Sequence, residues 1–229
     1  EHVHDLAYFS GSIYAVGSGA AHRREWEESS IHRYLWKSDD MGKTFSVFHR
    51  KRYSMGDGDT RYRALLSIGN KLYVFGYINP SNDNIPMEGR HLIISNNEMS
   101  DLEGPMKNIV VWKTWPLTDK LGLAIGNVGD KVSRTFQIDK NGPIELTNWS
   151  DKRILYISPG ESKGLWLVLA GNGAENENFR VYRFSEKSIN NLSPVLDLGL
   201  NSFSSISLWY QDLYLGSSDG KLFKANRIK

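Results

Sequence analysis

The order of hydrophobic and polar positions along the chain predicts short β-strands joined by tight turns. Runs of Tyr, Phe, Trp, Ile, Val and Leu are broken by Gly, Asn, Asp and Ser, as in "HDLAYFSGSIYAVG" and "RALLSIGNKLYVFG". This punctuation is typical of strands and hairpins. No long stretch places apolar residues at helical spacing, so the pattern predicts an all-β fold.

The same hairpin recurs along the chain and ends in a glycine each time. These glycines are 45 to 59 residues apart and are Gly17, Gly76, Gly126, Gly171 and Gly216. Such a period matches the length of a four-stranded propeller blade. We therefore predict a single five-bladed β-propeller domain over residues 1–229 with the glycines at equivalent positions. The blades are expected at about 1–50, 60–110, 111–150, 151–200 and 201–229. A solenoid or a β-sandwich is the alternative.

The remaining strands of each repeat follow from the same pattern. A third strand is expected after each glycine, and fourth strands are predicted in "TFSVFHR", "PIELTNW" and "PVLDLG". In the second repeat, "NIVVWKTWPL" has to supply both the fourth strand and the first strand of the next repeat. The last repeat leaves no room for a fourth strand and is expected to be three-stranded.

The stretch "SDDMGKTF" has the spacing Ser-x-Asp-x-Gly-x-Thr-Phe, formed by Ser38, Asp40, Gly42, Thr44 and Phe45. Asp40 can accept hydrogen bonds from the turn backbone, and Gly42 can adopt a positive φ. Phe45 is expected to pack into the sheet. The spacing resembles the Asp-box, or BNR, repeat of sialidase-like β-propellers, which joins the third and fourth strands of a blade far from the ligand face. The resemblance implies a structural role for Asp40. "SNNEMSDLE" and "DKNGPIEL" are at best eroded copies.

Composition and charge narrow the classes of partner. The 28 Lys and Arg residues nearly balance the 26 Asp and Glu residues, which argues against a nucleic acid or an acidic membrane as partner. The absence of cysteine excludes disulfides, thiolate metal sites and a cysteine nucleophile. No apolar run approaches transmembrane length. His2 and His4 alternate on one strand, but two ligands do not complete a metal site, so neither a metal nor a cofactor is expected.

Candidate ligand-binding residues come from the face where the first strands of a propeller begin and the loops between second and third strands emerge. This register places His4, Asp5, Arg61, Arg63, Trp115 and Arg153 around the central mouth, with Trp26 above it on the longest loop. Trp can stack on sugar faces, and Arg can bind a carboxylate through two parallel hydrogen bonds. The mouth would suit a sugar or an anionic ligand, although an ordinary polar channel explains these residues equally well.

Sialidase-like catalysis is the first enzymatic hypothesis. The resemblance to sialidases implies an Arg cluster, which Arg61, Arg63 and Arg153 could form, together with a Tyr nucleophile, its Glu partner and an Asp acid. That family is six-bladed, with several Asp boxes and an Arg-Ile-Pro-type motif near its start. This chain shows five repeats, one clear box and no such motif, which argues against sialidase activity.

A five-bladed glycoside hydrolase is the second enzymatic hypothesis. The opening "HVHDLAYFSGSIYAVGS" is similar to the start of arabinanase-type enzymes, and the resemblance implies that Asp5 is a catalytic base, although the usual Pro after it is Leu6 here. Hydrolysis also needs an acid at a defined separation, for which Asp59 and Glu88 are positional candidates. The structural alternative is that Asp5 is a hydrogen-bonded residue bridging neighbouring blades.

These observations favour a recognition module that binds a glycan or a protein surface, with the hydrolase using Asp5 as the alternative. Trp112, Trp149 and Trp209 would serve such binding unless they pack between blades. Phage and bacterial surface proteins use small propellers in this way, which is a fold-level analogy. The analogy predicts an extracellular, virion or cell-surface location, in a larger parent protein or assembly. Neither nucleic-acid binding nor membrane insertion is expected.

Overall fold

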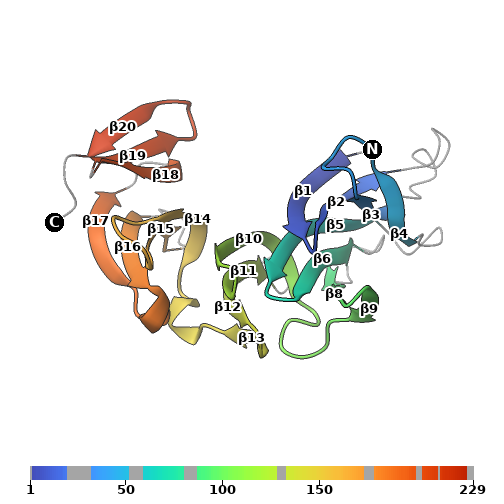
Figure 1. Cartoon of the computed structure of the whole chain (residues 1–229). Coiled ribbons are helices and arrows are strands. Elements are labelled where there is room, and N and C mark those ends of the chain that lie inside the picture. The colour runs from blue at the N-terminus through green and yellow to red at the C-terminus, as the bar shows by residue number, and fades with distance from the viewer. Residues whose placement is uncertain are drawn as a thin grey trace. The chain divides into compact units, whose positions relative to one another are not determined.

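The computed structural model describes residues 2–19, 32–51, 59–79, 87–127, 133–172, 178–199, 203–210 and 212–225 (Figure 1). Within these ranges the chain forms five antiparallel sheets and two short 3-10 helices, η1 (Thr147–Trp149) and η2 (Glu186–Ser188). The all-β prediction is confirmed. The chain divides into two compact units, residues 1–145 and 146–229. The prediction of one domain over the whole chain stays a prediction.

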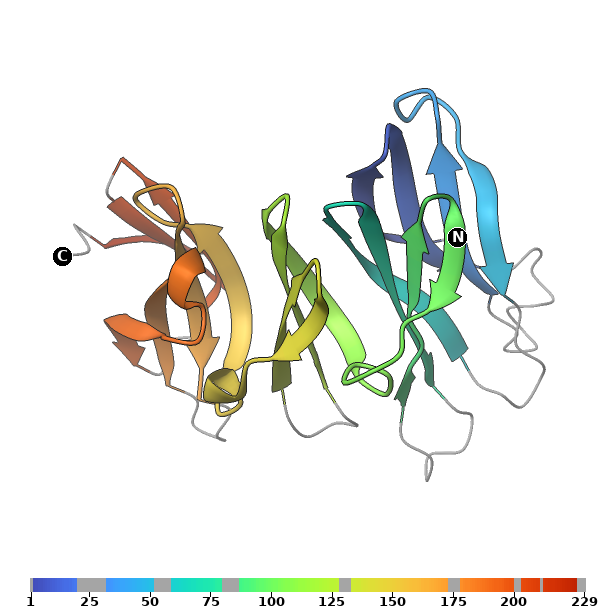
Figure 2. The ribbon, with the colours of Figure 1, turned by 60° about the horizontal axis from the view of Figure 1, so that its bottom comes forward.

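The first unit contains three sheets, whose strands pair in sequence order. The first sheet consists of β1 (His2–Phe9), β2 (Ser12–Gly19), β3 (His32–Ser38) and β4 (Ser46–Lys51). The second consists of β5 (Asp59–Ile68), β6 (Lys71–Asn79), β8 (Leu92–Ser95) and β9 (Glu98–Asp101), with β7 (Glu88–Gly89) paired to β6. The third consists of β10 (Val110–Thr118), β11 (Leu121–Asn127), β12 (Ser133–Asp139) and β13 (Gly142–Glu145). The sheets follow one another in space, because β1 contacts β5 and β5 contacts β10 (Figure 2).

The second unit contains two sheets. One consists of β14 (Arg153–Pro159), β15 (Leu165–Gly171), β16 (Phe179–Ser185) and β17 (Ser193–Gly199). The other consists of β18 (Phe203–Trp209), β19 (Asp212–Ser217) and β20 (Leu222–Ala225), so the last repeat is three-stranded within the described residues. Trp149 is fully buried in this unit, where its indole N–H donates to the Ile189 carbonyl at 3.0 Å. This Trp is part of a core and not of a binding surface.

The boundary of the second repeat differs from the sequence prediction. Its fourth strand is β9, so "NIVVWKTWPL" begins the third sheet as β10 and supplies no fourth strand to the second. Asn96 and Asn97 both have positive φ, which gives the two-residue hairpin turn before β9. All four residues of β9 are exposed, so the strand carries no apolar alternation that a sequence pattern could reveal.

The first strand of each sheet has a β-bulge near its start, opposite the end of the second strand. In each of the five sheets the pairing of the first strand with the second skips one residue at this place, and these residues are His4, Arg63, Trp112, Leu155 and Ser204; β10 also skips Leu117 near its other end. In the first unit, the residue before the bulge pairs with a glycine each time, and these are Gly17, Gly76 and Gly126. In the second unit the corresponding partners are Ala170 and Ser217, so Gly171 and Gly216 are each displaced by one residue from the predicted equivalence.

The bulge explains why glycine ends these hairpins in the first unit. A Cβ atom on Gly126 would lie 2.5 Å from the Val110 carbonyl oxygen, and one on Gly76 would lie 2.8 Å from the Arg61 carbonyl oxygen. A Cβ on Gly17 would overlap the His2 carbonyl. At the bulge, the backbone of the first strand therefore comes so close to the second strand that only glycine, which has no side chain, fits there.

The hairpin between β3 and β4 is organised by Asp40, which sits where the sequence places it. Its Oδ1 accepts hydrogen bonds from the Thr44 N–H at 2.9 Å and the Ser38 hydroxyl at 2.7 Å, while its Oδ2 accepts one from the Thr44 hydroxyl at 2.6 Å. Gly42 has φ +87° and donates its N–H to the Ser38 hydroxyl oxygen. The packing predicted for Phe45 is wrong, because its side chain is 44% exposed and it precedes the first paired residue of β4.

A related turn joins β19 and β20, at the connection between second and third strands. The Ser217 hydroxyl donates to Asp219, and the Lys221 N–H donates to the Ser217 hydroxyl oxygen at 3.0 Å. The Asp40 turn has the same two contacts, because the Ser38 hydroxyl donates to Asp40 and the Gly42 N–H donates to the Ser38 hydroxyl oxygen. Gly220 follows Asp219 directly, and this shorter spacing hid the likeness in the sequence.

We expect Asp40→Ala to lower the melting temperature without affecting any ligand-binding activity, because three hydrogen bonds of the turn lose their acceptor. The Thr44 hydroxyl, with the Thr44 N–H and the Ser38 hydroxyl, lowers the pKa of Asp40 from 3.8 to about 2. The stabilisation is therefore present above the pKa of the unfolded chain and is lost as the pH falls from 3.8 through about 2. Thermal melts between about pH 5 and pH 2 should show this loss in the wild type and not in Asp40→Asn; an equal loss in both contradicts it.

Candidate functional site

Two of the predicted mouth residues meet in the first unit. His4 and Arg63 are the bulge residues of the first and second sheets, and the Arg63 Nη1 lies 3.5 Å from the His4 Nδ1. The His4 Nε2 lies 3.2 Å from the hydroxyl of Ser18. Because a guanidinium only donates, the His4 Nδ1 accepts here, and the proton of the neutral ring lies on Nε2 and is donated to Ser18. The two bulges thus bring residues 59 positions apart into one polar group.

Asp5 connects the first two sheets. Its Oδ2 accepts the Leu65 N–H from β5 at 2.8 Å, and its Oδ1 accepts the Leu6 N–H at 2.8 Å. The Leu65 carbonyl in turn accepts the Thr114 hydroxyl from β10 at 2.7 Å. A hydrogen-bonded path therefore crosses the first strands of three sheets through the backbone of one residue. This is the arrangement that the bridging interpretation of Asp5 predicts.

A cavity of about 320 Å³ lies beside Asp5. Its walls come from β1, β5 and β10, and the other lining residues are Leu6, Ala7, Tyr8, Leu65, Leu66, Ser67, Thr114 and Pro116. Burial raises the pKa of Asp5, while the hydrogen bonds from Leu65 and Leu6 act in the opposite direction. Among the lining residues that the structure describes, Asp5 is the one carboxylate. A hydrolase needs a second, so this cavity lacks the pair within the described part of the chain.

The other candidate carboxylates do not complete a site in the described residues. Asp59 is the first residue of β5, but its side chain lies outside the described residues, as does the whole of Trp26. Glu88 on β7 forms an ion pair with Arg90 at 2.7 Å. Its partner Arg90 lines a different cavity from the one beside Asp5.

The remaining predicted mouth residues are distributed over both units. Arg61 on β5 and Trp115 on β10 are half-buried in the first unit. Arg153 begins β14 of the second unit, where its guanidinium carbon lies 5.9 Å from the centre of the Phe179 ring. Trp112, the bulge residue of β10, is half-buried against Tyr77 with the ring centres 5.5 Å apart.

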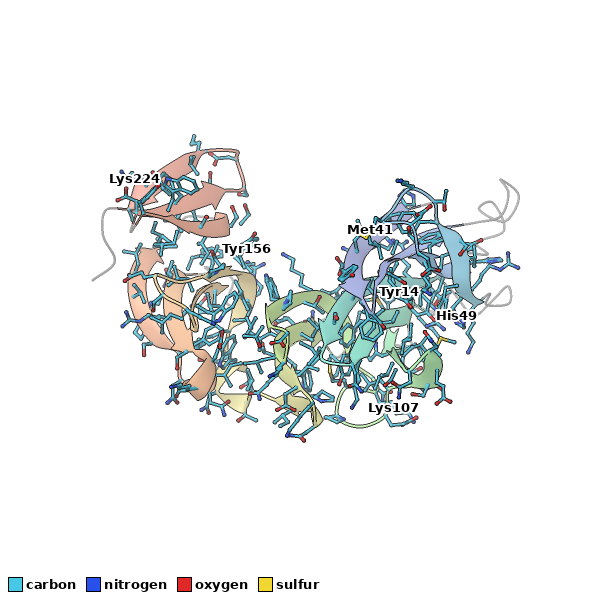
Figure 3. The ribbon with its side chains drawn as sticks, in the orientation of Figure 1. Tyr14, Met41, His49, Lys107, Tyr156 and Lys224 are labelled. Carbon is cyan, nitrogen blue, oxygen red and sulfur yellow. The ribbon has the colours of Figure 1, made fainter. Side chains whose placement is uncertain are left out.

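The sequence analysis missed two features with the chemistry of binding sites. The first is a basic cavity of about 670 Å³ between the first and second sheets, lined by Arg33, His49, Lys51, Tyr62, Arg90 and Lys107 among others. Figure 3 labels His49 on β4 and Lys107 in the segment after β9. The second is Tyr210 at the β18–β19 turn, which is 86% exposed and lies against Trp209, itself 63% exposed and already a candidate from the sequence. The adjacent pair "WY" was the only sequence signal for the latter.

Neither metal ligation nor a membrane-spanning helix is found in the described residues. Within them, no three His, Cys, Asp or Glu side chains stand close enough to hold a metal ion. No helix in the same ranges is long and apolar enough to cross a bilayer.

Comparison with known proteins identifies the fold and leaves the family open. No family model matches the chain, and no curated protein matches its sequence. The β-propeller domain of the Trilobed protease from Pyrococcus furiosus matches with a TM-score of 0.53 at 8% identity, over 97% of this chain and 66% of that one.

Two further solved structures match over nearly the whole chain. A Mycobacterium tuberculosis puromycin-hydrolyzing peptidase matches at 11% identity with a TM-score of 0.52, over 98% of this chain and 36% of that one. A Trypanosoma rangeli sialidase matches at 12% identity with a TM-score of 0.50, over 98% and 48%. The chain thus spans less than two thirds of the length of each of these structures. At such identities the likeness shows the fold alone, which is that of a β-propeller.

Proposed function

We propose that the chain is a five-bladed propeller that recognises a glycan or a protein surface through the mouth formed by its first strands. This proposal rests on the hydrogen bonds of the Asp5 carboxylate and on the residues that line the cavity beside it. Its two carboxylate oxygens each accept a backbone N–H, one of them from the neighbouring sheet. No second carboxylate among the described residues lines its cavity, whereas glycoside hydrolysis uses two carboxyl groups.

The polar group at the mouth has chemistry that suits recognition. A guanidinium carries five N–H donors, and the contact with His4 uses one donor of Arg63. The others can donate to the hydroxyl or carboxylate oxygens of a sugar or of an acidic side chain. Half-buried Trp115 supplies an aromatic ring on the third of the first strands, and Arg61 a further cation on β5. Such a ligand would find donors and an aromatic surface within one unit.

The alternative is a glycoside hydrolase that uses Asp5, and one observation favours it. Burial raises the pKa of Asp5, and a carboxyl group with a raised pKa is better matched to proton transfer near neutral pH. The resemblance of the opening stretch to arabinanase-type enzymes points the same way. Under this alternative the second carboxylate would be Asp59 or Glu88.

A glycan array probed with the isolated chain, followed by an assay for reducing sugar on every glycan that binds, separates the two functions. Binding without sugar release supports the recognition module, and release supports the hydrolase. Arg63→Ala should abolish or weaken binding at the mouth, whereas Arg180→Ala, which removes an exposed Arg of the fourth sheet, should not. Equal effects of both variants would place binding elsewhere.

Asp5→Asn tests the structural role of this carboxylate directly. Asparagine offers one carbonyl oxygen where aspartate offers two acceptors, so either the Leu6 or the Leu65 N–H loses its partner. We expect a loss of about 1–3 kcal/mol in the free energy of unfolding, measured by urea denaturation. Asp151→Asn, at an exposed carboxylate paired with Lys152, is the matched control and should change little. Sugar release that falls by roughly 10²–10⁴-fold in Asp5→Asn would instead make Asp5 catalytic.

A further inference from the structure

The fifth sheet has one apolar face and one mixed face. Its apolar face belongs to the core of the second unit, where Ile206, Leu213 and Leu215 are buried. The alternation of side chains along β18 and β19, together with the pairing register, places another set of side chains on the opposite face. We call this set the Trp209 face, and it consists of Ser207, Trp209, Asp212, Tyr214 and Lys224.

Trp209 ends β18 with an exposed indole ring. Trp209 pairs with Asp212 as the last pair before the turn, as Phe9 and Ile68 do in the first strands of the first and second sheets. Phe9 and Ile68 are buried in cores, whereas Trp209 is 63% exposed. Core packing therefore accounts for the apolar residue in those two sheets and does not account for the Trp in the fifth.

The turn that follows holds Tyr210 against Trp209. The two ring centres are 5.3 Å apart and the ring planes cross at 81°. Tyr210 has a φ of 47°, which bulky residues rarely adopt, and the corresponding turns of the first and second sheets have the small residues Ser10 and Gly69 there. Strained backbone of this kind is concentrated at functional sites. A Trp ring held in place by a neighbour also loses little conformational entropy when a ligand binds to it.

Hydrogen-bonding groups lie beside Trp209 on the same face. Asp212 is its direct neighbour across β18 and β19. The Lys224 Nζ on β20 lies 2.8 Å from the Asp212 Oδ2, and both side chains remain partly accessible (Figure 3 labels Lys224). Ser207 contributes an exposed hydroxyl two residues before Trp209. Because Asp212 and Lys224 neutralise each other, this pair suits an uncharged ligand that both donates and accepts hydrogen bonds.

We propose that the Trp209 face is a binding site for a neutral sugar ring, which stacks on the indole of Trp209 and exchanges hydrogen bonds with Asp212 and Lys224. A pyranose ring has a face of C–H bonds and a rim of hydroxyl groups. The negative face of the indole attracts the C–H bonds, while the carboxylate accepts from hydroxyl groups and the ammonium donates to them.

This site goes beyond the recognition proposed at the mouth and does not depend on it. Trp209 is the last residue of β18, whereas the bulge residues His4 and Arg63 lie near the starts of their first strands. The two sites are therefore built from opposite ends of the first strands, and variants of one should leave the other intact.

The experiment follows the indole N–H signals of the full chain by nuclear magnetic resonance during titration with the methyl glycosides of glucose, galactose, mannose and N-acetylglucosamine. Mannitol is the control, because it has the hydroxyl groups of a sugar without a ring face. The Trp209 signal is assigned by its disappearance in Trp209→Phe. We expect a saturable change of this signal with at least one of the four sugars and none with mannitol.

Saturation-transfer signals of the sugar that binds then measure the affinity of each variant. Trp209→Ala should weaken binding by at least about tenfold, because the stacking surface is lost. Asp212→Ala should weaken it by about threefold or more, since a charged acceptor is removed. The matched control is Phe45→Ala, which removes an aromatic ring that is 44% exposed in the first unit and should leave the affinity within about twofold of the wild type.

Three results would overturn the proposal. One is that none of the four sugars causes a saturable change of the Trp209 signal in the wild type. Another is that Phe45→Ala weakens binding as much as Trp209→Ala, because the effect then does not depend on this ring. The last is that Arg63→Ala abolishes binding of the sugar while Trp209→Ala does not, which would place the sugar at the mouth.

Discussion

Replacing His91 with alanine should cost about 3–5 kcal/mol of unfolding free energy. The residue is 4% exposed, and its side chain contacts three backbone groups from two segments, β6 and the segment between β9 and β10. Its Nδ1 accepts the Gly76 N–H at 3.2 Å, and its Nε2 lies 2.8 Å from the Ile109 carbonyl oxygen and 3.1 Å from that of Met106. Alanine would remove the acceptor of the Gly76 N–H and the donor to the Ile109 carbonyl, while the Met106 carbonyl keeps the Ile109 N–H as a donor. It would also open a void beside the Phe75 ring, which the imidazole contacts edge-on. Urea denaturation near neutral pH measures the loss.

The same residue should make stability depend on pH. Burial, together with the positive charges of Arg33 and Arg90, lowers the pKa of His91 from 6.5 to about 4, against the Ile109 and Met106 carbonyls, which raise it. Between these values the unfolded chain takes up a proton that the folded chain does not, so stability should fall as the pH drops from 6.5 to about 4. At 1.36 kcal/mol per pKa unit the total is about 3 kcal/mol.

His91→Gln is the control for this pH dependence. Glutamine has one acceptor and one donor group, so it can keep the contacts with Gly76 and Ile109 while carrying no titratable proton. We expect it to be less destabilised than His91→Ala and to lose much less stability on acidification than the wild type. If His91→Gln loses as much stability on acidification as the wild type, the pH dependence comes from other groups. His49 is the first of these to test, because its pKa is also lowered.

Gly126→Ala should destabilise the first unit by about 1–3 kcal/mol, near the upper end of that range. The added methyl group would lie 2.5 Å from the Val110 carbonyl oxygen and 2.6 Å from the Ile109 Cγ2, both in the buried junction between the second and third sheets. Backbone atoms cannot rotate away as a flexible side chain can, so β10 would have to shift. The midpoint of urea denaturation provides the measurement.

Two variants calibrate this result. Ala170 stands opposite the bulge of the fourth sheet, where an alanine already fits, so Ala170→Gly should lose only the propensity and packing of one methyl group, about 1 kcal/mol. Gly17→Ala should cost less than Gly126→Ala, because the overlapping carbonyl belongs to His2 at the very start of β1, where the strand can adjust. A Gly126→Ala variant as stable as the wild type would show that the bulge does not require glycine.

The hairpins could be predicted from sequence because their causes are local. Turn residues such as Gly42 and the apolar runs around them are adjacent in the chain, and the Asp40 turn forms from eight consecutive residues. The short strand β9 escaped because it has no buried side chain. Phe45 was misassigned because β4 begins at Ser46, two residues after the start of the predicted strand "TFSVFHR".

The binding chemistry was harder to predict, because it depends on which side chains from distant segments meet. A shift of the pairing register by one residue moves every side chain of a strand to the other face of the sheet. The sequence of β3 and β4 alone therefore could not show that Arg33 pairs with Lys51. His91 offered no periodic signal, since its partners lie 15 and 18 residues away. His4 lies beside Arg63 because both are bulge residues. A bulge arises from the pairing of two strands, and the glycines opposite the bulges are its only trace in the sequence.

The Leu65 amide has a consequence for how the molecule opens. Its proton is donated to a side chain of the first sheet and not to a strand of its own sheet. Exchange of this proton with solvent deuterium therefore requires the first and second sheets to separate, even while every strand within each sheet stays paired. Neighbouring amides held inside β5 and β6 would exchange only when that ladder itself breaks. The ratio of the two exchange rates thus distinguishes parting of adjacent sheets from unfolding of one sheet, at the resolution of a single residue.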